Sequence, residues 1–379
     1  MESPTGATIC EHFAALPDPR IDRAKRHELL DLLTVALCAV ICGADSWVEV
    51  ELFGNSKLAW FRTFLSLPNG IPSHDTFGRV FARLDPARFE ACFLAWIQGI
   101  ARRTVGEVIA IDGKTLRRSH DRSAGKAALD LVSAWATTNR LVLGQLAVSA
   151  GSNEITAIPE LLQVLALDGC IVSIDAIGCQ TAIAQTIVER GADYVLSLKA
   201  NQPTLHDAVE TYFAEVPRDG VRPATQELLR TVDGEHGRIE IRRYWVASDP
   251  ALLAYLNPVG VWPKLTSVGM VERERRVVGG KTSRERSYYL TSLPAQVKPF
   301  ARAVRGRWGI ENQLHWVLDI AFREDECRVR AGHAAENFAV LRHIALTLLR
   351  QETTARCGTK AKRLKAGWDH PYLLKVLTG

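Results

Sequence analysis

The sequence predicts an α/β fold in which a helical N-terminal segment precedes a mixed sheet, and a β-rich insertion interrupts that sheet. Three observations lead to this prediction. Apolar residues recur at helical spacing through about the first 100 residues, whereas residues 107 to 199 alternate short apolar runs with helical segments. Residues 203 to 293 are charged and strand-like, and helical patterning returns from about Val297. We therefore expect segments at 1–100, 105–202, 203–293, 294–350 and 351–379, the last of them a basic tail.

The first 100 residues are expected to form a small all-α domain. Their longest apolar run, Leu29 to Ala44, is too short to cross a membrane, and Asp31 interrupts it. The run also lacks the small-residue cleavage site of a secretory signal, so it predicts a buried helix. Further along, Pro72 to Asp85 sets apolar side chains at helical spacing, which indicates a second amphipathic helix.

The sheet is expected to begin as a three-stranded meander. Its second and third strands are separated only by Asn139 and Arg140, and asparagine at the first loop position suits a tight hairpin. Helices and strands then alternate, which favours a mixed sheet with the first and fourth strands side by side. The expected strands are Glu107 to Gly113, Leu131 to Thr138, Leu141 to Ser149, Cys170 to Ala176 and Asp193 to Lys199.

The insertion is expected to be antiparallel, because Ile239 to Val246 alternates in polarity and Gly279 with Gly280 separates its last two strands. Its basic residues would form an electrostatic track for nucleic acid if alternate ones share a sheet face. The acids between them make a salt-bridged surface the alternative. These basic residues are Arg242, Arg243, Arg273, Arg275, Arg276, Arg284 and Arg286, and the acids are Glu240, Glu272, Glu274 and Glu285.

Composition narrows the class of protein only in part. The 47 basic and 42 acidic residues give a net charge of +5 and a pI near 8.8, which is too mildly basic to identify a nucleic-acid-binding protein. The eight cysteines show no CxxC pairs and no histidines at metal-ligand spacing. They read as reduced thiols, so we expect a cytosolic location.

Two aspartates stand at the ends of apolar runs. Asp112 ends VIAID and Asp175 ends IVSID, so both carboxylates would emerge at one edge of a sheet whose first and fourth strands are neighbours. The alternative for Asp112 taken alone is a simple turn, because Gly113 follows it. Poorly solvated acids repel each other, and a divalent cation is the usual group that neutralises them.

The third acid is expected to be Glu311, on a helix. Arg307 and His315 lie four residues to either side of it on one helical face, although a structural ion pair among the three is the alternative. Trp308 and Trp316 are predicted to pack in the core, with a platform for a partner strand as the alternative. Other acids close by in sequence are Asp319, Glu324, Asp325 and Glu326. Three carboxylates of this kind are what a two-metal phosphoryl-transfer site needs.

Longer motifs carry a family resemblance over nearly the whole chain. The segments are IDGKTLRRS, SIDAIGCQ, LKANQ, WGIENQLHWVLDIAFREDECRVR and AENFAVLRHIAL. In this order they resemble the transposases of ISAs-type insertion sequences, the branch of DDE transposases that includes the H-repeat-associated proteins. The resemblance implies an RNase H-like catalytic domain in two parts, 105–202 and 294–350, split by the β insertion at 203–293. Residues 1–100 then resemble the preceding helical domain, a candidate for DNA binding.

The resemblance also implies which residues form the site. It places a catalytic, metal-binding triad at Asp112, Asp175 and Glu311. A related branch with a β insertion carries tyrosine, arginine, glutamate and lysine around the third acid. Here Arg307 matches the arginine, but Val304 stands at the tyrosine position and Leu318 at the lysine position.

The expected activity is that of a DNA transposase that binds the terminal inverted repeats of its element. Two Mg²⁺ ions, replaceable by Mn²⁺, would support strand hydrolysis and then transfer of the 3′-hydroxyl. The expected partners are double-stranded DNA and a second copy of the chain on that DNA, with no membrane, in the bacterial cytoplasm at the nucleoid. Candidate DNA contacts, each of which could instead orient the acids, are Lys114, Lys199, Asn201, Arg307 and His315.

Two other activities remain open from the sequence. An RNase H-like nuclease that cuts without strand transfer would use the same triad, because water and a 3′-hydroxyl are equivalent nucleophiles in such a site. An inactive DNA-binding remnant of a mobile element is the other alternative, although the presence of all three acids argues against it.

Overall fold

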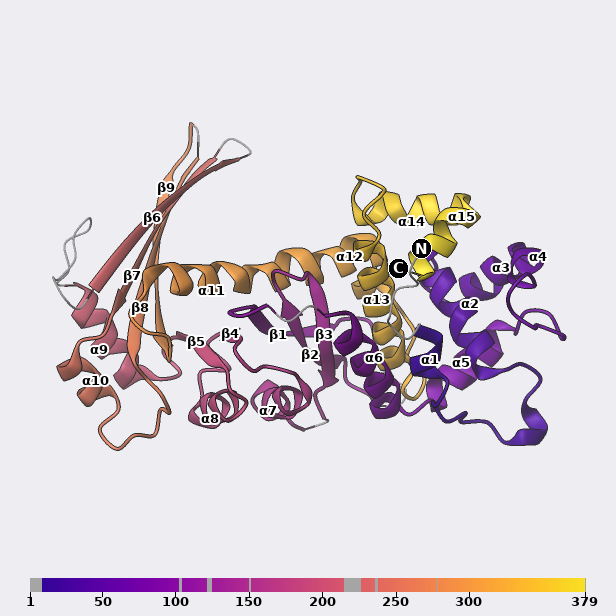
Figure 1. Ribbon diagram of the computed structural model, residues 1–379, viewed down its shortest axis with the longest axis horizontal. Helices are drawn as coiled ribbons and strands as arrows, with labels where there is room; N and C mark the ends of the chain where they lie inside the picture. The colour runs from indigo at the N-terminus through magenta and orange to yellow at the C-terminus, as the bar shows by residue number, and fades with distance from the viewer. Residues whose placement is uncertain are drawn as a thin grey trace.

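A computed structural model describes residues 9–101, 104–120, 125–149, 151–214, 226–235, 238–277 and 279–378. The molecule is elongated, with a helical lobe at one end, a sheet in the middle and a ribbon of long strands at the other end (Figure 1). Segments far apart in the sequence join these parts in two ways. Helices from both ends of the chain form the lobe, and the ribbon continues the central sheet.

The N-terminal helices begin the helical lobe. The apolar run forms a buried helix, as predicted, and Gly43 ends it with a φ of 121°. Ser46 and Glu49 cap the next helix reciprocally, each side chain accepting a hydrogen bond from the other's backbone N–H. The bounds are α1 Ile9–Phe13, α2 Leu29–Cys42, α3 Trp47–Ser56, α4 Leu58–Phe61, α5 His74–Arg83 and α6 Pro86–Ile100, with a 3₁₀ turn at Asp22–Ala24.

Among the described residues, no single helix is long and apolar enough to cross a membrane. Helices α2 and α3 would together meet that length and composition, but they are bent by 97° at their junction.

The central sheet has the predicted meander followed by two parallel strands. β1 pairs antiparallel with β2 and parallel with β4, and β4 pairs parallel with β5. The order β3-β2-β1-β4-β5 is that of the expected RNase H-like mixed sheet. The bounds are β1 Val108–Leu116, β2 Leu129–Ala136, β3 Leu141–Ala147, α7 Glu154–Val164, β4 Ile171–Ile174, α8 Thr181–Glu189 and β5 Asp193–Leu198.

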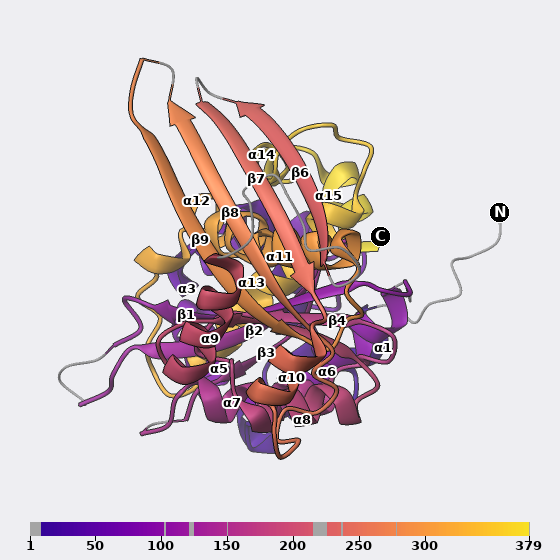
Figure 2. The same cartoon turned by 90° about the vertical axis from the view of Figure 1, so that its left-hand side faces the viewer.

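The insertion forms four long antiparallel strands, as its alternating pattern predicts. Its last strand also pairs with β5, so the described strands make one continuous sheet of nine, in the order β3-β2-β1-β4-β5-β9-β8-β7-β6. The sequence did not indicate this junction. Figure 2 shows the ribbon rising beyond the helices. The bounds are α9 Pro203–Ala214, β6 Gln226–Glu235, β7 Arg238–Ala247, α10 Pro250–Leu256, β8 Ser267–Val277 and β9 Thr282–Thr291.

Helices cover both faces of the central strands (Figure 1). α7 and α8 pack on one face, and α11 (Val297–Gly309) packs on the other through Phe300 and Val304. The chain runs on from α11 through a π-helical turn, Ile310–His315, into α12 (Trp316–Phe322). α11, the π-helical turn and α12 thus form one continuous helix that lies across the sheet and ends in the helical lobe (Figure 1).

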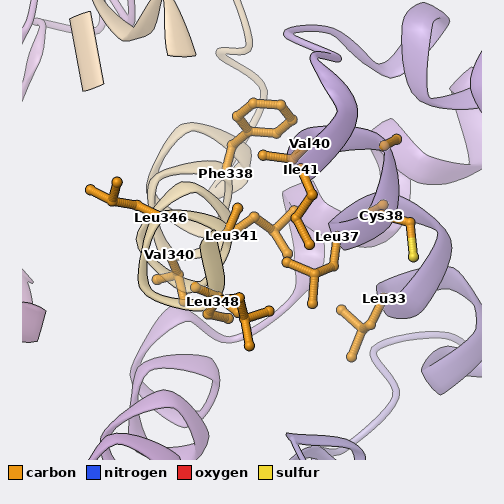
Figure 3. Close-up of a cluster of buried hydrophobic side chains, with 14 of the residues drawn as sticks. Leu33, Leu37, Cys38, Val40, Ile41, Phe338, Val340, Leu341, Leu346 and Leu348 are labelled. Atoms are coloured by element: carbon orange, nitrogen blue, oxygen red, sulfur yellow. The ribbon is translucent and has the colours of Figure 1, made fainter. Parts of the chain in front are cut away.

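The lobe is completed by the C-terminal helices. Leu33, Leu37 and Ile41 of α2 pack against Phe338 and Leu341 of α13 (Figure 3). The first 100 residues therefore share a hydrophobic core with the last 70 or so instead of enclosing one of their own. The bounds are α13 Ala334–Gln351, α14 Thr359–Trp368 and α15 His370–Thr378, with a 3₁₀ turn at Glu324–Glu326.

The basic tail is folded into this lobe. Arg363 of α14 donates to the carbonyl oxygens of Val40 and Ala321, and Lys362 donates to that of Leu349. Both side chains are buried. Arg363 therefore joins the two ends of the chain through Val40, whereas Lys362 fixes α14 to the end of α13.

Candidate active site at the carboxyl ends of two parallel strands

The register of β1 and β4 places two of the predicted acids at one edge of the sheet. Ile111 pairs with Ile174, and Asp112 and Asp175 are the residues that follow them. The Asp175 carboxylate accepts hydrogen bonds from the backbone N–H groups of Ile177, at 3.0 Å, and Gly178, at 3.4 Å. These bonds fix the direction of the Asp175 side chain as the chain turns away from the strand.

The third acid faces the same edge. Burial, and after it the carboxylates of Asp175 and Glu311, raise the pKa of Asp112 to about 7. The Arg307 guanidinium, which opposes them, lies 3.7 Å from a Glu311 carboxylate oxygen. Because these carboxylates repel one another at one sheet edge, a cation bound between them would stabilise their charged forms.

Glu311 stands in the π-helical turn, not in an ordinary α-helix. The N–H of Trp316 donates to the Glu311 carbonyl oxygen five residues earlier, and this pairing widens the turn. Side chains four residues apart therefore no longer lie on the same face where the π-turn intervenes. Arg307 keeps its contact with Glu311, whereas His315 turns towards Asp112, with 3.5 Å between Nδ1 and a carboxylate oxygen.

The His315 imidazole is neutral at physiological pH. Burial, and after it the nearby Lys114 ammonium, lower its pKa to about 4. A neutral ring can donate a hydrogen from one nitrogen only. Its Nε2 is buried without a protein partner, so donation from Nδ1 to Asp112 is the arrangement that fits this surrounding.

Lys114 is held inside the protein. Its ammonium group donates to Asp319 and, at 2.8 Å, to Glu324, and its side chain is only 12 % exposed. Burial opposes its charge, but the two carboxylates leave the pKa of Lys114 above its usual value. Of the two roles open to Lys114, these contacts favour orienting the neighbourhood of Asp112. Asp319 and Glu324, two of the other candidates for the third acid, are thus ion-paired with Lys114.

The remaining candidates lie on the loop after β5. Lys199 is exposed there. The Asn201 side-chain amide donates to the Ala176 carbonyl oxygen at 2.6 Å, which ties this loop to the one that follows Asp175. Asn201 thus contacts the backbone that carries an acid, and the structure supports an orienting role for it.

A fourth acid, Glu154, was not predicted. It stands in the first turn of α7, and its carboxylate lies against Gly113, so that a Cβ atom at Gly113 would collide with it. Glu154 raises the pKa of Asp112, and its own pKa is raised by burial and by Asp175. The only signal in the sequence was the glycine that follows Asp112.

The tryptophans beside the third acid behave differently from each other. Trp308 is half-buried, with Arg273 of the insertion 4.8 Å above its ring. The core prediction is wrong for Trp316, which is 60 % exposed. Val304 and Leu318, which depart from the related signature, are both buried among apolar side chains, so neither position offers a polar group to the site.

The basic residues of the insertion divide between the two faces of the ribbon. Arg273 and Arg275 share one face with Arg242, whereas Arg276 lies on the other. On that second face, four arginines surround the buried Glu272 and Glu274, with N–O distances of 2.6 to 3.6 Å. The salt-bridged surface is therefore realised there, by Arg243, Arg276, Arg284 and Arg286.

A different group of possible metal ligands lies on α9. His206, Asp207 and Glu210 have ligand atoms within 4.8 Å of one another. Both acids are exposed, and ion-pair distances of 3.4 and 3.9 Å to His206 account for the grouping. Asp112 and the three acids around it differ from this group, because burial and repulsion by the three neighbouring carboxylates act together on Asp112.

Comparison with known families decides the identity. A model described as "Transposase DDE domain" matches residues 103–348, and one described as "DDE_Tnp_1-associated" matches residues 10–97. The chain belongs to the DDE transposase family. This family member is 37 % identical over 374 residues to the "H repeat-associated putative transposase YhhI" of Escherichia coli K12, covering 98 % of each chain. It is 38 % identical over 370 residues to the "Putative transposase YncI" of E. coli O157:H7, covering 98 % of this chain and 94 % of that one.

A solved structure, a piggyBac transposase synaptic complex with hairpin DNA, aligns with a TM-score of 0.41 and 11 % identity. The alignment covers 97 % of this DDE-family chain and 75 % of the other. A likeness this low carries no argument about function. The family assignment rests on the two domain models and on the full-length relatives.

Proposed function

We propose that this DDE-family protein is a DNA transposase that binds the terminal inverted repeats of its insertion sequence, cleaves a DNA strand and joins the freed 3′-hydroxyl to target DNA. The proposed catalytic residues are Asp112, Asp175 and Glu311. The observation that carries the proposal is the convergence of acids from three separate elements, β1, the end of β4 and the π-turn, on one sheet edge.

The same residues are proposed to hold the metal ions. Their donor atoms are all oxygens, which suit Mg²⁺ and its substitute Mn²⁺, and the raised pKa of Asp112 marks a position that a nearby cation would stabilise. Two such ions would supply an activated attacking oxygen and a stabilised leaving oxygen. Glu154 is close enough to contribute a further carboxylate.

The chain's own residues would orient these acids and the DNA. The neutral His315 ring would hold the Asp112 carboxylate in place, and Asn201 would hold the loop that carries Asp175. Arg307 would contact a DNA phosphate beside Glu311, and the exposed Lys199 would add a second phosphate contact. Synapsis of two element ends would need a homodimer on DNA, in the cytoplasm with the bacterial nucleoid.

The test is an excision and insertion assay on a donor plasmid that carries the gene's own flanking DNA. Glu311→Gln keeps the size of the side chain but removes its charge, and should abolish Mg²⁺-dependent joined products. Glu326→Gln is the matched control, since Glu326 lies in the same stretch of chain and pairs only with Arg323 in the contacts of the described residues. This control should behave as wild type.

Other products would contradict the proposal in distinct ways. Nicked or cleaved DNA without joined molecules from wild type would identify a nuclease. A footprint on the element ends without cleavage would identify a DNA-binding remnant. Full joining by Glu311→Gln would remove Glu311 from the site.

A further inference from the structure

The π-turn that carries Glu311 is an intrinsically unfavourable structure. A π-helix has a wider turn than an α-helix and persists mainly as single turns at functional sites. In this protein the turn spans Ile310–His315 and lies within an otherwise continuous helix. Contacts from outside the helix are therefore the place to look for what stabilises it.

One side chain from another helix reaches the turn directly. Arg350, in the last turn of α13, donates a hydrogen bond from its guanidinium group to the carbonyl oxygen of Gln313. Gln313 lies in the middle of the π-turn, where the regular i to i−4 ladder is interrupted. A side chain that bonds to a carbonyl at such a break is a recognised cause of departures from α-helical geometry.

The guanidinium group is held in place from its other side. It lies over the Trp135 ring, 4.5 Å from the ring centroid, and Trp135 is fully buried on β2. The same indole limits the helix just before the turn, because a Cβ atom at Gly309 would stand 3.3 Å from its ring nitrogen. Trp135 thus packs against Gly309 and against the Arg350 guanidinium group, which donates to the Gln313 carbonyl oxygen.

Arg350 is a largely buried cation. Burial, and after it the charge of Arg140, lower its pKa to about 10, so the group stays protonated at neutral pH. Removing a charge from water is costly unless fixed partners compensate for it. Among the contacts of the described residues, the compensating groups are the Gln313 carbonyl and the Trp135 ring.

We infer that Arg350 is a positioning residue for the third acid: by holding the Gln313 carbonyl against the Trp135 platform, it fixes the π-turn and so sets the Glu311 carboxylate towards Asp112. This inference rests on the proposed function for its catalytic consequence. The hydrogen bond and the stacking contact that support it do not depend on any activity.

Two substitutions separate the hydrogen bond from the bulk of the side chain. Arg350→Met keeps a long apolar stem but removes the donor, and Arg350→Lys restores a donor without the planar group. Arg356→Met is the matched control, because Arg356 is exposed in the loop after α13. Loss of a residue that orients a metal ligand lowers metal affinity or activity by roughly 10- to 100-fold. We expect the cleavage rate of Arg350→Met to fall by roughly 10- to 100-fold, and the Mn²⁺ concentration needed for half-saturation to rise by about the same factor.

Arg350→Lys should recover part of both values, and Arg356→Met should match wild type. Amide hydrogen exchange supplies a readout that needs no activity. In Arg350→Met the amides of residues 310–316 should exchange faster, whereas those in the middle of α13 should keep their protection.

The outcomes distinguish the inference from the proposed function. If wild type cleaves DNA and Arg350→Met keeps the wild-type rate and half-saturation, the role of Arg350 is refuted and the proposed function stands. If exchange rises equally over the whole helical lobe, or if lysine restores nothing, Arg350 is a general structural residue and the inference fails. If wild type neither cleaves nor joins DNA, the proposed function fails, and faster exchange confined to the turn still supports the contact.

Discussion

Replacing Asp112 with asparagine should make the metal-free protein more stable. The folded state raises the pKa of this carboxyl from 3.8 to about 7, chiefly by burial and then by the charges of Asp175 and Glu311. Between these two pH values the folded state holds a proton that the unfolded state has lost. The free energy of unfolding therefore falls as pH rises through this window and stays low above pH 7.

The size of the effect follows from the pKa shift. One pKa unit corresponds to about 1.36 kcal/mol, so a rise from 3.8 to about 7 costs about 4 kcal/mol when the carboxyl is ionised. The Asp112 side chain is 20 % exposed, so solvent screens this cost only slightly. Asparagine has no charge to desolvate. Its stability advantage should be about 2 kcal/mol at pH 5.5 and about 4 kcal/mol at pH 8.5, to order of magnitude.

Urea unfolding followed by tryptophan fluorescence in a chelating buffer measures this difference at the two pH values. Glu160→Gln, which changes an exposed acid on α7, is the control and should shift neither midpoint. Adding Mg²⁺ should then stabilise wild type but not Asp112→Asn, because only wild type keeps the carboxylate. An asparagine variant no more stable than wild type at pH 8.5, or an advantage independent of pH, would refute the reasoning.

Three further changes test other parts of the structure. Lys114→Met leaves the buried Glu324 carboxylate without its ammonium partner, so it should lower the free energy of unfolding by about 3 to 5 kcal/mol. Thermal unfolding measures this loss, and the double variant that also carries Glu324→Gln should recover part of it. Gly113→Ala should displace Glu154 and reduce the DNA cleavage rate more than tenfold at unchanged DNA affinity; equal rates would place Glu154 outside the site. Leu37→Ala should cost about 2 to 5 kcal/mol in urea, and a cost below 1 kcal/mol would contradict the tight packing of α2.

The part of the site on the sheet could be predicted because strand order determines it. Apolar runs ending in Asp112 and Asp175 indicate buried strands, and a meander followed by a crossover makes those two strands parallel neighbours. The sheet edge follows from these two facts without any knowledge of side-chain packing. The third acid was less certain from the pattern, since five acids lie close together in that stretch of sequence; Arg307 and His315 favoured Glu311, and the family resemblance then pointed to the same residue.

Other features depend on contacts that a linear pattern does not contain. The spacing of Arg307, Glu311 and His315 assumes an α-helix, and the π-turn sends His315 to a different partner. Nothing near Glu154 in sequence reveals that it packs against Gly113. The sequence shows only that the tail is basic, and it does not show that Arg363 is buried, because its acceptors Ala321 and Val40 are backbone carbonyl oxygens distant in the chain.

The shared core of α2 and α13 has a consequence for how such a gene decays. A copy truncated at its start loses α2 and exposes the apolar face of α13, and a copy truncated at its end exposes the matching face of α2. Either fragment keeps an intact sheet edge with its acids yet cannot close its helical lobe. Damage at either end of the gene should therefore yield chains that aggregate or are degraded, so a partly deleted copy would not leave behind a stable folded protein.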